Sequence, residues 1–338
     1  MTTAARQTVR LHPADNVVVA CADLPSGTSL QIERITTMRA IPAGHKLATA
    51  PIAQGEPVRK YNQIIGFAAQ DIAVGQHVHL HNVELHSFDR SHQIGVDVRP
   101  TDMVPQATRA TFEGIVRPDG RVATRNYIGL LTTVNCSASV AEFVADQFRG
   151  DALADFPNVD GVVALTHDHG CGGCTPVSKS YIQRTVAGYA RHPNFAAVVI
   201  IGLGCEQNQI SELVASGLVT PDDRIQTFTI QESGGTAESV RRGTALVHEL
   251  LEDANNCYRQ RCPASELILG LECGGSDGYS GISANPALGV AADLLVRHGG
   301  TACLAETPEI FGAEHLLTRR AVHADVGEKL LERIRWWQ

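Results

Sequence analysis

The sequence predicts an α/β protein with a small N-terminal β-clip domain, residues 14–86, a linker, residues 87–111, and a mostly parallel α/β sheet domain, residues 112–338. Two observations support this prediction. The first 86 residues contain short strand-like runs that are separated by glycine turns. After Phe112, short apolar runs alternate with longer helix-like stretches. That alternation is typical of a parallel sheet with helices on both of its faces.

Composition excludes several classes of function. The chain has 338 residues and a net charge of −8, which argues against a general binder of nucleic acid or of anionic membranes. The longest apolar run, residues 196–201, is far too short to cross a bilayer, and no targeting segment is visible. The nine cysteines lack the spacing of a disulfide framework. We therefore expect a cytoplasmic protein with reduced thiols.

The N-terminal domain contains a repeated turn pattern in which an apolar residue is followed three positions later by glycine. The four copies begin at Leu24, Ile41, Ile52 and Ile72. Tight turns at these glycines predict a compact β-clip with sharp corners. After the last turn, His77, His79 and His81 alternate along a predicted strand and therefore share one face. They are candidates for metal ligands or for hydrogen bonds to a substrate, and the alternative is a solvated polar strand face.

The linker, residues 87–111, is polar, contains Pro100 and Pro105, and lacks helical or strand periodicity. From Phe112 onward we expect six strands. These are residues 127–134, 162–165, 197–203, 225–230, 267–271 and 301–305. We also expect helices at residues 140–148, 177–191, 210–216, 287–298 and 324–335, and a long helix that ends near residue 254. Every predicted strand ends in a cluster of polar, cysteine or glycine residues, so one parallel sheet would place all six clusters along a single edge.

The densest cluster lies at residues 165–176, where a predicted strand is followed by a helix. It contains two imidazoles, a carboxylate, two thiols and three glycines. Ligands of open α/β sheets bind at the carboxyl ends of the strands. We therefore predict that this stretch forms one wall of an active site.

Cysteines in these clusters suggest metal chemistry. Cys171 and Cys174 form a Cys-x-x-Cys pair, and Cys136, Cys205 and Cys273 follow neighbouring strands. A zinc site, a redox pair and an iron–sulfur cluster with three thiolates all remain open, and so does simple packing of each cysteine as a small apolar residue. We assign the remaining four to packing: Cys21, Cys257, Cys262 and Cys303.

A basic stretch precedes the first strand of the second domain. Arg121 or Arg125 would suit a substrate carboxylate, with Asn126 beside them, and the alternative is salt bridging at the surface. The chain has no Walker loop and no complete dinucleotide fingerprint.

Several long motifs carry a resemblance to a known family. They are residues 119–137 (DGRVATRNYIGLLTTVNCS), 167–172 (HDHGCG), 202–206 (GLGCE) and 271–278 (LECGGSDG). In this order they resemble the altronate/galactarate dehydratases. The front part is similar to the SAF-type domain of that family, through residues 41–45 (IPAGH), 55–61 (GEPVRKY) and 78–82 (VHLHN). The resemblance extends from about residue 15 to about residue 315.

The resemblance implies an enzyme of sugar-acid catabolism, including hexuronate metabolism. Such a hydro-lyase converts a sugar acid to a 2-keto-3-deoxy acid with a divalent metal, Fe²⁺ or alternatively Mn²⁺. A base removes the proton at C2, the enediolate charge is stabilised, and an acid expels the C3 hydroxyl. The small-molecule substrate would be altronate or galactarate. The resemblance also implies that the family's C-terminal portion is missing from this chain.

The residues with expected roles fall into three groups. Candidates for acid–base catalysis are His79, His81, His167 and His169. Candidates for substrate binding are Lys60, Asn82, Arg121, Arg125, Asn126, Asn135, Ser137 and Asp277. Candidates for metal ligands are His79, His81, Cys171, Cys205, Glu206, Glu272 and Cys273.

Two alternatives remain open. One is a sulfo-lyase that acts on a small hydroxy sulfonate, and the other is a truncated protein that binds a sugar acid without turnover. Trp336 and Trp337 suggest an interface, so we expect a homo-oligomer, a dimer, that binds neither nucleic acid nor membrane.

Overall fold

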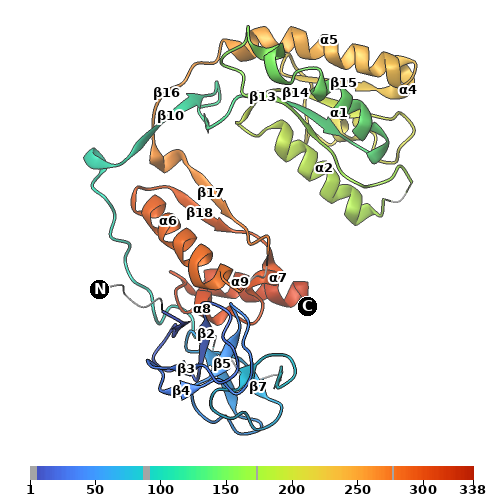
Figure 1. Ribbon diagram of the computed structural model, residues 1–338. Coiled ribbons are helices and arrows are strands. Elements are labelled where there is room, and N and C mark those ends of the chain that lie inside the picture. The colour runs from blue at the N-terminus through green and yellow to red at the C-terminus, as the bar shows by residue number, and fades with distance from the viewer. Residues whose placement is uncertain (1–5, 87–91, 173, 276–277) are drawn as a thin grey trace. The chain divides into compact units, whose positions relative to one another are not determined.

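The computed structural model describes residues 6–86, 92–172, 174–275 and 278–338 of a mixed α/β protein (Figure 1). The chain forms two compact units. Unit 1 combines residues 1–103 with residues 268–338, and unit 2 consists of residues 104–267. The chain therefore passes from one unit to the other twice. Each unit is described separately below.

The N-terminal part of unit 1 consists of three small antiparallel sheets. The first has the order β1 (Thr8–Val9), β2 (Val17–Ala20), β5 (Lys46–Ala48) and β8 (His77–Val78). The second pairs β3 (Ser29–Leu30) with β4 (Ile35–Thr36). The third has the order β6 (Pro57–Lys60), β7 (Gln63–Ala68) and β9 (Val83–Glu84). All the strands are short, and two small cores lie between them.

The repeated turn pattern explains how this β domain closes. Leu24 forms a β-bridge with Ile41, and Ile52 forms one with Ile72. All four side chains are buried. The glycine that ends each copy has a positive φ, between 78° and 83°, which L-residues with side chains rarely adopt. The predicted turns are thus confirmed, and the four copies act as two pairs.

The C-terminal part of unit 1 forms a small α/β layer. A parallel pair of strands joins β17 (Ile268–Leu271) to β18 (Thr301–Leu304), with a single π-helical turn (Ser280–Ala284) and α6 (Asn285–Arg297) between them. The chain continues through α7 (Thr307–Ile310), α8 (His315–Thr318) and α9 (Ala324–Trp337). Tyr61 donates a hydrogen bond to the Gly281 carbonyl, and Tyr279 donates one to the Cys21 carbonyl. These bonds join the β-clip to the C-terminal segment.

The expected linker, residues 87–111, is divided between the two units, and its residues 87–91 lie outside the described part of the chain. Within unit 1, Arg319 forms an ion pair with Asp97 at 2.6 Å, and Arg297 forms one with Asp102 at 2.8 Å. Within unit 2, the linker includes a 3-10 turn at Gln106–Thr108.

Unit 2 is organised around a four-stranded parallel sheet. The strand order is β13 (Gly161–Leu165), β12 (Tyr127–Thr132), β14 (Phe195–Gly202) and β15 (Ile225–Thr229). The helices are α1 (Ala138–Asp146), α2 (Pro176–Ala190), α3 (Ile210–Ala215), α4 (Ile230–Ser233) and α5 (Thr236–Asn255). Every residue of β14 is buried, as expected for the inner strand of a sheet that is covered on both faces.

Separate cores on the two faces of this sheet confirm the predicted helix placement. One core contains side chains of α1 and α5, and the other contains side chains of α2 and α3. In Figure 1, α5 and α2 lie on opposite sides of the strands. The sheet therefore presents the carboxyl ends of its four strands along one edge, where the connecting loops begin.

Only four of the six expected strands belong to this sheet, so the expectation of one edge with six clusters is wrong. The chain leaves the parallel sheet after α5 because β16 (Gln260–Pro263) pairs antiparallel with β10 (Thr111–Val116), which also pairs with β11 (Val122–Ala123). The last two predicted strands, β17 and β18, then form their own parallel pair in unit 1.

None of the helices among the described residues combines the length with the hydropathy that a bilayer-spanning helix requires.

Candidate functional site

The carboxyl edge of the parallel sheet in unit 2 brings three clusters together. They contribute three exposed thiols: Cys136, Cys171 and Cys205. Backbone hydrogen bonds connect the three loops. The Asn135 amide donates to the His169 carbonyl at 2.8 Å, and the Gln207 amide donates to the Cys171 carbonyl at 2.9 Å. The loops after β12, β13 and β14 are thus held side by side.

The thiols interact with one another and with polar neighbours. Partial desolvation, followed by the proximity of the Cys171 and Cys205 thiols, raises the pKa of the Cys136 thiol. The Gln231 side chain follows β15 and donates from Nε2 to the Cys205 sulfur at 3.2 Å. Gln231 was not among the expected site residues, because a lone glutamine carries no recognisable chemical signal in a sequence.

The Glu206 side chain stabilises the loop after β14 at this edge of the sheet. Its side chain is 3% exposed. Its Oε1 accepts hydrogen bonds from the Thr133 hydroxyl at 2.8 Å and the Leu203 amide at 3.1 Å, and its Oε2 accepts one from the Gly204 amide at 2.6 Å. The carboxylate that we expected to bind metal therefore fixes the turn that carries Cys205.

His167 and His169 lie in the loop after β13, and their ring centroids are 6.2 Å apart. Together with side chains of α2 they line a cavity of about 250 Å³. His167 Nδ1 accepts a hydrogen bond from the His169 amide at 3.1 Å. Burial lowers the pKa of His167 below its usual range, so this imidazole is neutral near pH 7.

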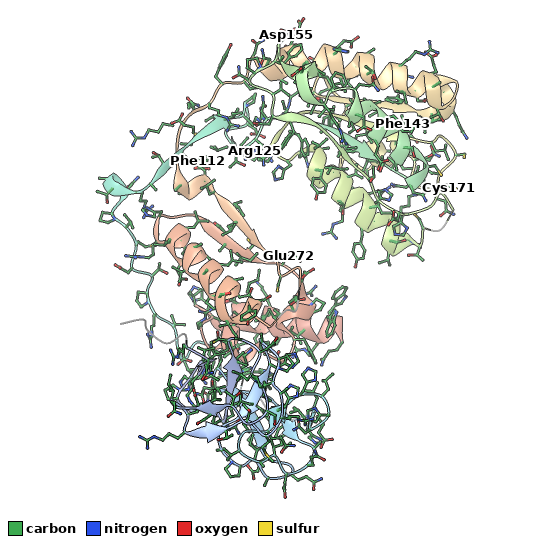
Figure 2. All side chains as sticks on the ribbon, in the orientation of Figure 1. Phe112, Arg125, Phe143, Asp155, Cys171 and Glu272 are labelled. Carbon is green, nitrogen blue, oxygen red and sulfur yellow. The ribbon has the colours of Figure 1, made fainter. Side chains whose placement is uncertain are left out.

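Arg121, Arg125 and Asn126 precede β12 and therefore lie at the opposite edge of the same sheet. Figure 2 shows Arg125 and Cys171 at opposite ends of unit 2. Arg121 forms an ion pair with Asp119 at 2.6 Å. Asn126 is fully buried and bonds to Arg117 and to two backbone carbonyls. Within unit 2, these residues are not brought together with the thiols.

Two other predicted substrate-binding residues serve the backbone. Ser137 is buried and donates to carbonyl oxygens, including that of Ile201 at 2.9 Å. Asn82 is buried, accepts from the His79 amide at 2.9 Å and donates to the His77 carbonyl at 2.9 Å. Asn82 thus fixes the turn that carries the predicted histidine face.

In unit 1, four imidazoles form a compact cluster. The ring centroid of His45 lies 5.1 Å from that of His77 and 5.0 Å from that of His79. The His77 and His81 centroids are 5.4 Å apart, and Arg39 contacts His81 Nε2 at 2.6 Å. His77, His79 and His81 are therefore close together as predicted, although only His77 lies in a strand.

A cationic cavity of about 290 Å³ adjoins this cluster. The side chains that line it include His45, Lys46, Lys60 and His79. Burial and then the charge of Lys60 lower the pKa of Lys46. Burial also lowers the pKa of Lys60, and Asp15 opposes that shift. Two half-buried ammonium groups in one cavity favour an anionic ligand, because an anion offsets both their desolvation and their mutual repulsion.

Lys60 and His79 were expected site residues, whereas His45 and Lys46 were not. The turn repeat could have indicated both residues, because they directly follow the turn that ends at Gly44. Lys46 begins β5, and β5 pairs with β8, the strand that contains His77. The Cβ that a side chain would add at Gly44 would lie 3.1 Å from the Gly278 backbone. The C-terminal segment therefore passes directly beside this cavity.

The remaining predicted residues lie in the loop after β17. Glu272 is exposed, and Cys273 is half-buried with its thiol 3.5 Å from the Gly275 carbonyl. Asp277 lies outside the described residues. Figure 2 shows Glu272 at the end of this strand, in unit 1.

The donor atoms of the candidate metal ligands that the structure describes are not arranged around a single divalent ion. Within the described ranges, no group of three or more His, Cys, Asp or Glu side chains is arranged to hold one. His45 Nδ1 and His77 Nε2 contact each other at 2.9 Å, and Arg39 contacts His81. In unit 2, the Glu206 carboxylate is already hydrogen-bonded. No chemical step is therefore assigned to a single bound ion.

The protein thus combines a β-clip that contains a cationic cavity with a parallel α/β sheet whose carboxyl edge carries thiols and imidazoles. These features define a multidomain α/β protein. Profiles of three domains match it. They are the altronate/galactarate dehydratase SAF domain at residues 6–86, the second domain of D-galactarate dehydratase/altronate hydrolase at residues 114–255, and the C-terminal D-galactarate/altronate dehydratase domain at residues 264–338. The chain belongs to the altronate/galactarate dehydratase family.

Three curated relatives show the extent of the similarity. The altronate dehydratase of Bacillus subtilis is 33% identical over 96% of this chain and 65% of its own length. The galactarate dehydratase (L-threo-forming) of Escherichia coli is 35% identical over 97% of this chain and 64% of its own length. The (2R)-sulfolactate sulfo-lyase subunit beta of Chromohalobacter salexigens is 32% identical over 65% of this chain and 52% of its own length. The chain thus spans less than two thirds of the length of these relatives.

Proposed function

We propose that this protein is a hydro-lyase that dehydrates a sugar acid of the altronate or galactarate type to a 2-keto-3-deoxy sugar acid. The observation that carries the proposal is the cavity in unit 1 that combines two half-buried ammonium groups, Lys46 and Lys60, with the imidazoles of His45 and His79. The names of the relatives support this substrate class.

The substrate carboxylate binds to Lys46 and Lys60. Charge-assisted hydrogen bonds from ammonium groups are strong, and they strengthen further when the carboxylate gains charge. Loss of the C2 proton turns the carboxylate into an enediolate, whose extra negative charge both lysines stabilise. The same pair therefore binds the substrate and lowers the barrier to C–H cleavage.

A neutral imidazole in the cavity accepts the C2 proton. Burial, followed by the charges of His79 and Lys46, lowers the pKa of His45, so His45 is uncharged near pH 7 and able to act as a base. His79 is the second candidate because it lines the same cavity. After proton removal, the C3 hydroxyl leaves as water with a proton from a general acid, and the resulting enol tautomerises to the 2-keto acid.

The proposal is tested by incubating the reduced protein, prepared anaerobically with ferrous iron, with altronate and with galactarate and measuring the 2-keto-3-deoxy acid. We expect product, and we expect Lys60→Met to lower kcat/KM about 10- to 100-fold, since one hydrogen bond to a charged group contributes about 1.5–3 kcal/mol. Lys329→Met is the matched control because this lysine lies exposed on α9, 3.6 Å from Asp325. Equal losses in both variants would contradict the assignment of the cavity.

A sulfo-lyase is the alternative, and the partial match to the sulfolactate sulfo-lyase subunit beta favours testing it. A short match to the subunit alpha of the same organism, 53% identical over 45 residues, strengthens the case for this test. Release of sulfite from sulfolactate, without dehydration of either sugar acid, would replace the proposed reaction. Binding of a sugar acid without turnover would indicate a non-catalytic binding protein.

We also propose a cytoplasmic homodimer. All nine cysteines are free thiols, which suits a reducing compartment. Trp336 on α9 is 65% exposed, and an indole of that exposure suits a subunit interface. Light scattering of wild type and Trp336→Ala tests the dimer, and a monomeric wild type would refute it.

A further inference from the structure

The three thiols at the edge of unit 2 have no role in the proposed reaction at the cationic cavity. Each follows a different strand of the parallel sheet, and the backbone bonds from Asn135 to His169 and from Gln207 to Cys171 hold their loops together. All three are exposed, whereas a cysteine that serves only packing is usually buried.

The thiols lie close to one another and to a side-chain hydrogen-bond donor. Gln231 donates a hydrogen bond to the Cys205 sulfur at 3.2 Å. Cys136 lies in the 3-10 turn Asn135–Ser137 that leads into α1, and its thiol is in hydrogen-bond contact with the Cys171 thiol. Glycines flank Cys171 on both sides, and a Cβ added at Gly170 or Gly172 would meet no atom within 4 Å. The thiol of Cys171 is therefore accessible from more than one direction.

The chemistry of the three thiols indicates which kinds of metal centre they could bind. Three thiols are soft ligands, which favour zinc, copper or iron–sulfur clusters over hard ions. A structural zinc site requires four ligands on one ion, and the carboxylate nearest in sequence, Glu206, is already hydrogen-bonded. A cluster differs from a single ion because its thiolates bind separate iron atoms and need not converge on one point.

We propose that Cys136, Cys171 and Cys205 bind an iron–sulfur cluster of the [4Fe–4S] type through three thiolates. Such a cluster leaves one iron without a protein thiolate, and that iron supplies Lewis-acid chemistry when the cluster is bound. Binding of the cluster rests only on unit 2.

The experiment is anaerobic reconstitution of the reduced full-length protein with ferrous iron and sulfide, followed by measurement of iron, acid-labile sulfide and visible charge-transfer absorption. We expect about four iron and four sulfide per chain in wild type. Cys136→Ser, Cys171→Ser and Cys205→Ser should each lose most of both. Cys303→Ser is the matched control, because Cys303 is also exposed but lies on β18 in unit 1, and it should bind as wild type does.

Circular dichroism establishes that each variant is folded, and the triple serine variant provides a second test. Iron and sulfide in equal amounts in the triple variant and in wild type would overturn the proposal. So would metal uptake without sulfide, or no uptake by the reduced wild type. A bound cluster without keto-acid product would refute the proposed function alone.

Discussion

At the scale of single residues, the imidazole cluster of unit 1 shows how proximity changes ionisation. Burial, followed by the neighbouring His45, His81, His79 and Arg39, lowers the pKa of His77 to about 4. The ring therefore remains neutral at pH 7, and it contacts His45 at 2.9 Å. A neutral His77 adds no positive charge to that of the two lysines that line the neighbouring cavity.

This shift predicts a pH dependence of stability. Between about pH 4 and pH 6.5, His77 binds more protons in the unfolded chain than in the folded chain, so the free energy of unfolding falls as the pH falls through that window. His77→Gln removes this contribution. We therefore expect its urea midpoint to fall less between pH 7 and pH 5 than the wild-type midpoint does.

His323→Gln is the control for this measurement, since His323 is exposed at the start of α9. It should follow the wild-type profile. A His77→Gln profile that matches wild type would show that this imidazole is not disfavoured in its charged form.

At this scale, the positions of the chemically distinctive residues were easier to predict from the sequence than the role of each side chain. The thiols and histidines were found because sulfur and imidazole have few other uses at loop junctions. We expected Glu206 to bind a metal ion and Asn82 and Ser137 to bind the substrate. In the structure, all three side chains form hydrogen bonds with backbone groups of the chain itself. A sequence shows a polar group, but it does not show whether a backbone amide or carbonyl nearby already satisfies it.

At the scale of elements, the repeated turns show two different reasons for a glycine: a positive φ, and the close approach of another backbone segment. Gly55 and Gly75 end equivalent turns, with φ of +83° and +78°. A Cβ at Gly55 would meet nothing within 4 Å, whereas a Cβ at Gly75 would lie 2.0 Å from the Thr36 carbonyl oxygen. The first glycine is required only by its φ, and the second is required also by the close approach of the backbone.

Alanine substitutions should measure this difference. Gly55→Ala should lower the free energy of unfolding by about 1–2 kcal/mol, the cost of a left-handed conformation. Gly75→Ala should lower it by about 1–3 kcal/mol more, because the backbone must move to relieve the clash. Chemical denaturation of both variants tests the ranking, and equal effects would show that the Thr36 segment moves freely.

The strands and main helices of the parallel sheet in unit 2 were predictable nearly to the residue, whereas β10, β11 and β16 were not predicted. The helix expected at residues 177–191 is α2, residues 176–190, which begins at Pro176 after the capping side chain of Thr175. The strand expected at residues 197–203 is β14, residues 195–202. Which strands pair with one another was less predictable than where each strand lies in the sequence. The runs that form β17 and β18 resemble the earlier strands, and nothing local shows that β16 takes the chain out of the first sheet.

At the scale of the whole molecule, unit 2 is inserted into unit 1. Both cores of the parallel sheet draw only on residues between 127 and 254, so they are complete without either end of the chain. Unit 1, in contrast, needs two distant segments, whose contacts include Tyr61 with Gly281 and His315 with Gln63. Near residue 112 the sequence changes from short strand-like runs to alternating strand-like and helix-like runs, which indicates a domain boundary. No comparable change after residue 267 indicates that the chain there becomes part of unit 1 again.

This division predicts that residues 104–267 fold alone. We expect the isolated fragment to unfold in one cooperative transition with native-like circular dichroism, since its hydrophobic cores are self-contained. A fragment that ends at residue 225 should not fold, because it lacks β15 and the α5 side of one core. A disordered 104–267 fragment would show that its stability depends on unit 1.

The insertion also sets an order of events on the ribosome. The ribosome makes the β-clip before unit 2, and it makes the segment that passes beside Gly44 only after the whole of unit 2. The lysine cavity therefore lacks this segment at least while the 164 residues of unit 2, 104 to 267, are synthesised, at about 5–20 residues per second. If unit 2 folds by itself as predicted, it buries its apolar strands within this interval, before the second part of unit 1 is available.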